Sequence, residues 1–236
     1  MLLGLSRQEA KRLEQYLSYT QTPHGLQIMT RTQESLATLL NAYCPSSILT
    51  FGGRVPVTSA RALNYSYDMG VTCPNTKSSS VSFDYKRVPF PSEMFDLIVV
   101  FHMHEIVDKP EALCSEISRL LMPEGIVVFF GFTPFMLRLG KIANQKSGLD
   151  WFRTVFSPQG LVELCGVHHL TKGYELYYGY DIVPFHSSSW VKYLGMPHFR
   201  SSYLPSTSCL YKCVLVSRQP NWLSLTGNQM RPAGGV

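Results

Sequence analysis

Long apolar runs and dense charge are both missing from this chain of 236 residues. No apolar stretch reaches the roughly 20 residues that a membrane-spanning helix needs. The N-terminal MLLGL is too short for a secretory signal core, and the charged stretch RQEAKRLE follows almost at once, which predicts no signal peptide. With 45% apolar and 16% charged residues, the composition indicates a globular protein with a sizeable core.

Closely spaced cysteine pairs are missing as well. The six cysteines are scattered, without a C-x-x-C pair and without the density of a disulfide framework. We therefore expect reduced thiols and a cytoplasmic protein. Cys209 and Cys213 lie four residues apart in a predicted strand, so we expect them to face the core rather than to bind a metal.

Acidic residues are absent from the last 55 residues, because all sixteen lie at or before Asp181. The five bases of that region therefore carry the whole net charge of +5, and aromatic residues are interleaved with them. Basic and aromatic residues together occur in proteins that bind nucleic acids, anionic substrates or membrane surfaces. Five charges are sparse for such a role, so we favour a solvated basic face over an aromatic core.

Helices and strands are predicted to alternate along most of the chain. The expected strands are residues 48–51, 63–67, 81–83, 95–103, 126–132, 174–185 and 210–217. The alternation predicts an α/β fold, with a mostly parallel sheet and helices on both faces. The last two strands have no helix between them, which favours an antiparallel edge strand. We expect an N-terminal helical segment packing on the core at residues 1–45, the main domain at 46–218 and a flexible tail at 219–236.

The stretch VPFPSEMFDLIVVFHMHEIVDKPEALCSEISRLLMPEGIVVFFGF, residues 88–132, carries a family pattern. The matching elements are Val88-Pro89-Phe90, Phe95-Asp96, His102, Asp108-Lys109-Pro110, Glu116, Arg119-Leu120-Leu121, Pro123 and Gly125. At this spacing the stretch resembles the centre of class I S-adenosylmethionine-dependent methyltransferases of the small-molecule, type 11-like kind. Through GFTPF and LVSRQPNWLSL the chain is also similar to a YafS-like subgroup of short bacterial proteins. The resemblance implies a Rossmann-like sheet, S-adenosylmethionine as cofactor and S-adenosylhomocysteine as product.

In an open α/β sheet, ligands bind outside the carboxyl ends of the strands, where the strand order reverses. The stretch ILTFGGRVP, residues 48–56, then forms the first strand and its turn. The resemblance implies cofactor contacts from Phe51, Gly52, Gly53, Asp68, Asp84, Tyr85 and Phe101. Asp84 would accept from the adenine amino group and Asp68 would bind the ribose hydroxyls, although a turn-capping role explains Asp84 equally well.

The turn departs from the family pattern, because Arg54 and Pro56 stand where more glycine is usual. Only about two helical turns fit between Gly53 and the second strand, so the helix whose amide groups would face the ligand is short or absent. This departure is the main sequence argument against cofactor binding.

His102 is the candidate catalytic residue, expected at the mouth of the site as a general base with a pKa suited to neutral pH. A strand-end histidine satisfied by the backbone explains it as well, and we favour that interpretation. His104, Glu105 and Asp108 are close in sequence, but we expect no metal, because a third ligand and supporting partners are lacking. Asp108 is instead expected to be a helix N-cap.

Three functions remain, in this order of preference. The first is an S-adenosylmethionine-dependent methyltransferase acting on an unidentified small molecule. The second is a protein of the same fold that has lost cofactor binding and serves as a binding or assembly partner. The third is a nucleic-acid methyltransferase or binder that uses the basic C-terminal region. The chain has FHMHEI where base-modifying members carry an Asn-Pro-Pro-Tyr type of tetrapeptide, so we do not expect a nucleic-acid partner, and the oligomeric state stays open.

Overall fold

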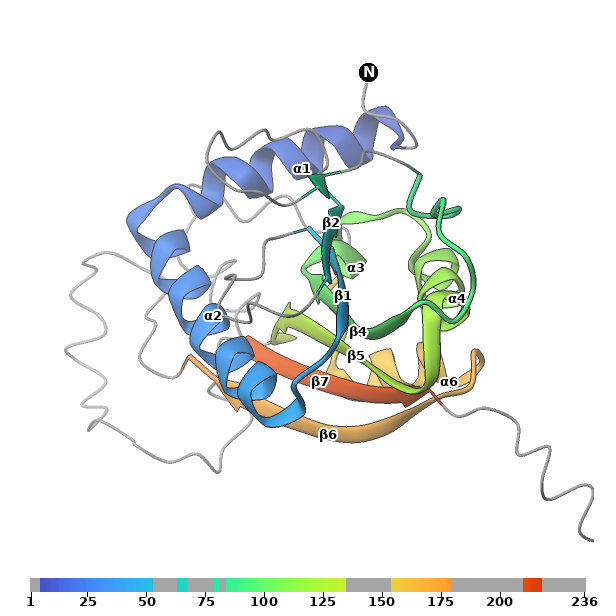
Figure 1. Cartoon of the computed structure of the whole chain (residues 1–236). Helices are drawn as coiled ribbons and strands as arrows, with labels where there is room; N and C mark the ends of the chain where they lie inside the picture. The colour runs from blue at the N-terminus through green and yellow to red at the C-terminus, as the bar shows by residue number, and fades with distance from the viewer. Residues whose placement is uncertain are drawn as a thin grey trace, which may run out of the picture.

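The computed structural model in Figure 1 describes residues 5–52, 63–67, 79–80, 84–134, 154–179 and 210–217. Its strands form one sheet with the order β3-β2-β1-β4-β5-β7-β6. They are β1 (Ser47–Phe51), β2 (Leu63–Tyr67), β3 (Ser79–Ser80), β4 (Phe95–Phe101), β5 (Leu121–Phe132), β6 (Leu170–Tyr178) and β7 (Leu210–Ser217). Only β7 runs antiparallel to its neighbours, β5 and β6, whereas the other pairs in the described part of the chain are parallel. The predicted fold class is confirmed.

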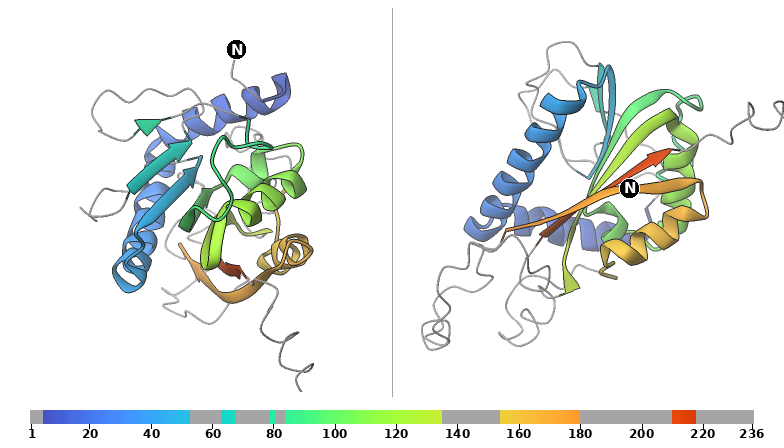
Figure 2. Two further views of the ribbon diagram at one scale, coloured as in Figure 1. Left: turned by 45° about the vertical axis from the view of Figure 1, so that its right-hand side comes forward. Right: turned by 90° about the horizontal axis from the view of Figure 1, so that it is seen from below.

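The helices lie on both faces of this sheet. They are α1 (Arg7–Thr20), α2 (Pro23–Tyr43), α3 (Met103–Ile106), α4 (Pro110–Leu120) and α6 (Pro158–Gly166). Figure 2 shows α2 along one face and α4 and α6 along the other. The N-caps of α1, α2 and α6 are Ser6, Thr22 and Ser157. The side-chain oxygen of each accepts a hydrogen bond from a backbone amide in the first turn of its helix.

The side chains of β4 are buried on both faces of the sheet. Leu97, Val99 and Phe101 pack with residues of α2, while Ile98 and Val100 pack in the cluster that includes α1, α4 and α6. A strand buried on both faces needs apolar residues at every position, which is why its sequence shows no polar alternation. Burying each such side chain contributes about 1.5–3 kcal/mol.

Three strand predictions change at their ends. The strand expected at 126–132 begins five residues earlier as β5, whose first residue, Leu121, already pairs with Phe95 of β4. The strand expected at 95–103 stops at Phe101, because His102 takes a left-handed conformation with a φ of 52° and α3 begins at Met103. The final antiparallel pair is present, but β6 begins at Leu170, four residues before the expected start at Tyr174, and its register shifts between Lys172 and Tyr174. That bulge breaks the period of two on which the prediction depends.

Two other predictions concern residues outside the described ranges. The strand expected at 81–83 lies outside them, directly after β3. The tail expected at 219–236 lies outside them too, so the division into domains stays a prediction. None of the helices within the described ranges is both long and apolar enough to cross a bilayer.

Candidate functional site

The strand order reverses between β1 and β4. These two strands are parallel neighbours, but β2 lies beyond β1 on one side and β5 lies beyond β4 on the other. Connections that leave in opposite directions open a crevice outside the carboxyl ends of the two central strands. The ends of β1 at Phe51 and of β4 at Phe101 therefore define the candidate site.

Gly52 shapes this crevice. Its φ is +77°, and a Cβ atom placed on it would lie 2.4 Å from the carbonyl oxygen of Phe101. Any side chain would push the two strand ends apart, so glycine is required there. A turn without a side chain at the reversal point fits a site in which the backbone approaches a ligand. Gly53 and Asp68, two further predicted cofactor residues, lie outside the described residues.

Phe51 and Phe101 contribute their backbone to the crevice. Both side chains are fully buried, and they lie in the clusters on opposite faces of the sheet. The Phe101 ring stacks on Phe130, with 5.4 Å between the ring centroids. Because both rings are committed to the core, a ligand at the crevice would meet their main-chain atoms.

Asp84 and Tyr85 lie together, as their sequence requires, but their side chains do different things. The Asp84 Oδ1 atom accepts a hydrogen bond of 3.0 Å from the Lys86 amide, which is the turn-capping role considered above. Its side chain is half-buried, and the Oδ2 atom makes no hydrogen bond to any described residue. Tyr85 is buried, and its hydroxyl donates to Glu9 Oε1 over 2.7 Å. Tyr85 therefore binds the N-terminal helix.

His102 is buried at the end of β4 rather than at an open mouth. Its Nδ1 atom lies 2.7 Å from Glu105 Oε2, and the Phe132 amide donates to Glu105 Oε1 over 2.9 Å. Burial lowers the pKa of His102 to about 3 and raises the pKa of Glu105 to about 8. Near pH 7 the two groups form a neutral hydrogen-bonded pair. The role of His102 as a general base stays a prediction.

His104 has a separate partner. Its Nε2 atom lies 2.9 Å from the Tyr211 hydroxyl of β7, and burial lowers its pKa to about 4. His102 and His104 do not share one strand face, because the chain turns at His102 and His104 belongs to α3. Within the described ranges, no group of three His, Cys, Asp or Glu side chains is placed to hold a metal ion.

Comparison with known proteins connects this geometry to a fold family. A family model described as a methyltransferase domain matches residues 58–129. No curated protein sequence matches the chain. The structure is similar to 1,6-didemethyltoxoflavin-N1-methyltransferase from Burkholderia thailandensis, solved with 1,6-didemethyltoxoflavin and S-adenosylhomocysteine bound, with 13% identity, 91% of each chain covered and a TM-score of 0.57. It is also similar to an S-adenosylmethionine-dependent methyltransferase from Thermotoga maritima, with 15% identity, 78% of this chain and 89% of that chain covered, and a TM-score of 0.52.

The chain has the class I methyltransferase fold.

Within this methyltransferase fold, the E-x-x-R pattern of α4 is a structural clamp. The Val88 amide donates to Glu116 Oε1 over 2.7 Å. The Arg119 guanidinium donates to the carbonyl oxygens of Val88 and Phe90, over 3.0 and 2.9 Å, and forms an ion pair with Glu116. The pattern thus holds the V-P-F turn against α4, close in sequence to Asp84. Sequence reasoning quoted these residues as a motif but missed their contacts.

Two acidic residues of the motif also have structural partners. The Asp96 carboxylate accepts hydrogen bonds from the amides of Ser46 and Ser47, over 3.0 and 3.1 Å, at the amino ends of β1 and β4. Asp108 is not the N-cap of α4, because Lys109 occupies that position. Its carboxylate instead binds α1 through Ser6 and Arg12, which corrects the N-cap prediction.

Proposed function

We propose that the protein is an S-adenosylmethionine-dependent methyltransferase that acts on an unidentified small molecule. The observation that carries the proposal is the reversal of strand order between β1 and β4, where α/β proteins bind ligands. Gly52 lies at this point and has no side chain that would keep a ligand from the backbone. The methyltransferase family model supports it. The similar Burkholderia thailandensis protein holds S-adenosylhomocysteine and a small molecule together.

The proposal assigns roles to the residues predicted from the sequence. Cofactor contacts come from Phe51, Gly52, Gly53, Asp68, Asp84, Tyr85 and Phe101. Phe51, Tyr85 and Phe101 contribute main-chain atoms, because their side chains are buried. S-adenosylmethionine supplies an activated methyl group when it is bound. His102 is the proposed general base beside the acceptor; burial keeps its ring neutral near pH 7, and the pKa of about 3 makes that ring a weak base. Glu105 holds that ring in one orientation through the Nδ1 contact.

The proposal also includes a cytoplasmic enzyme of the YafS-like bacterial subgroup. The scattered cysteines, without a C-x-x-C pair or the density of a disulfide framework, support the compartment.

Isothermal titration calorimetry with S-adenosylmethionine and S-adenosylhomocysteine tests the proposal. We expect saturable binding by the wild-type protein. Asp84→Ala should weaken it about tenfold, the usual effect of removing one hydrogen bond to a charged group. Glu163→Ala is the matched control, because Glu163 is exposed on α6. No binding at millimolar ligand by folded protein would refute the function, whereas unchanged affinity of Asp84→Ala would refute only the adenine contact.

A further inference from the structure

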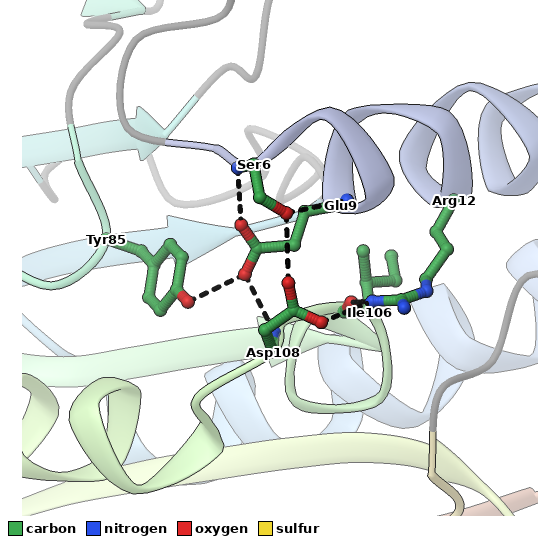
Figure 3. A network of polar contacts seen from close by, with 6 residues as sticks. All are labelled: Ser6, Glu9, Arg12, Tyr85, Ile106 and Asp108. Atoms are coloured by element: carbon green, nitrogen blue, oxygen red, sulfur yellow. Dashed lines mark hydrogen bonds and ion pairs between the residues drawn. The ribbon is translucent and has the colours of Figure 1, made fainter.

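The first turn of α1 fastens two distant segments to each other (Figure 3). Glu9 is the centre of this network, with a side chain only 1% exposed. Its Oε1 atom accepts hydrogen bonds of 2.7 Å from the Tyr85 hydroxyl and 2.7 Å from the Asp108 amide. Its Oε2 atom accepts 2.6 Å from the Ser6 amide, which completes the capping box of α1. One carboxylate therefore joins three segments.

Asp108 adds a second set of bonds to the same turn. The Ser6 hydroxyl donates to Asp108 Oδ2 over 2.9 Å, and Arg12 donates to Asp108 Oδ1 over 2.8 Å. Arg12 also donates to the carbonyl oxygen of Ile106, the last residue of α3, over 3.1 Å. The connection between α3 and α4 is thus held by both its backbone and its side chain.

The buried, charged carboxylate of Glu9 needs hydrogen-bond donors at fixed positions. Burial alone would raise its pKa, but the hydrogen bonds from Asp108, Ser6 and Tyr85 outweigh burial and hold the pKa below its usual value. When a hydrogen-bond donor is removed from a buried carboxylate that stays ionised, the folded protein is strongly destabilised. Tyr85 and the Asp108 backbone are therefore kept in one position relative to α1.

Both segments adjoin residues assigned to the proposed site. Tyr85 directly follows Asp84, and α3 directly follows His102 at the end of β4. Further along the same helix, the Tyr16 ring lies 5.6 Å from the His102 ring. One face of α1 therefore contacts Tyr85, next to Asp84, through Glu9 and His102 through Tyr16.

We propose that α1 is a clasp over the crevice and that Glu9 is a positioning residue for cofactor binding. Glu9 does not touch the cofactor in this proposal, which rests on the proposed methyltransferase function. It acts by fixing Tyr85, and with it the Asp84 turn, relative to the end of β4. If Glu9 served stability alone, its loss would lower the free energy of unfolding and leave the affinity of the folded protein unchanged.

The test is a double-mutant cycle with S-adenosylhomocysteine as the probe. Calorimetry measures Kd for the wild type, Glu9→Gln, Tyr85→Phe and the double variant. Urea unfolding of each protein shows that it is folded under the conditions of the binding measurement. We expect each single variant to raise Kd at least tenfold and the double variant to bind no worse than the weaker single one, because both remove the same contact. Glu14→Gln, exposed on the same helix, should bind like the wild type.

Each outcome decides something different. A wild type that fails to bind refutes the proposed function, and this inference with it. A wild type that binds, together with a folded Glu9→Gln of equal affinity, leaves the function in place and overturns the positioning role. If Glu9→Gln does not fold, Tyr85→Phe decides alone, because it removes one hydroxyl group and keeps the ring. Additive effects in the cycle would also overturn the proposal, since they would mean that Tyr85 acts without Glu9.

Discussion

Alanine at position 52 tests the close approach of β1 to β4 at the crevice. Gly52 has a φ of +77°, a left-handed conformation that costs a residue with a Cβ about 1–2 kcal/mol. The new Cβ would also lie 2.4 Å from the Phe101 carbonyl oxygen. That oxygen belongs to the main chain of a central strand and cannot swing aside. We therefore expect Gly52→Ala to lower the free energy of unfolding by about 3 kcal/mol.

Urea unfolding followed by circular dichroism measures this loss. Gly166→Ala is the matched control, because a Cβ on Gly166, at the end of α6, would meet no atom within 4 Å. We expect that control to be unchanged or up to about 1 kcal/mol more stable, since alanine favours a helix more than glycine does. Equal unfolding midpoints and slopes for Gly52→Ala and the wild type would refute the close approach, and with it the shape of the crevice.

Two further predictions concern the buried pair and the clamp. Burial raises the pKa of Glu105 to about 8 in the folded protein, so near neutral pH the folded state holds a proton that the unfolded chain has lost. Stability should therefore fall by about 1 kcal/mol as the pH rises from 7 to 8; His102 and His104, with their lowered pKa values, are neutral in the folded protein and mostly neutral in the unfolded chain over that window. Unfolding curves of Glu105→Gln should lack this decline, and an equal decline in the variant would contradict the assignment. Arg119→Met should lower the free energy of unfolding by about 2 kcal/mol, because it removes the hydrogen bond to Phe90 and the ion pair of α4. Arg31→Met, in an exposed ion pair of α2, should change it by less than about 0.5 kcal/mol, and equal losses in the two arginine variants would mean that the clamp is not stabilising.

Local pattern predicted the central strands well. The run FDLIVVF is apolar at almost every position, and the structure buries it on both faces as β4. The strand predicted at 210–217 is observed with the same bounds as β7. Those predictions depend only on the chemistry of neighbouring residues. The ends were less predictable, because His102 turns the chain by a backbone angle that no sequence period records.

Part of the candidate site was also predictable. Two glycines after a strand indicated the turn at Gly52, and the structure adds that Gly52 has a left-handed φ of 77°. The contacts of Glu9 and Arg119 were not predictable, because their partners lie far away in sequence. Glu9 and the Asp108 amide are 99 residues apart, and Arg119 and Val88 are 31 apart.

The sequence by itself determined where this chain alternates strand and helix, and hence its α/β class, since burial on a sheet or helix face imposes a period on neighbouring residues. The tertiary structure alone decided which polar groups meet. A buried carboxylate such as Glu9 needs donors wherever the fold brings them, and here the topology places Tyr85 and Asp108 beside α1. Local periodicity does not predict such pairings, because they depend on the order of the strands and on where the helices dock.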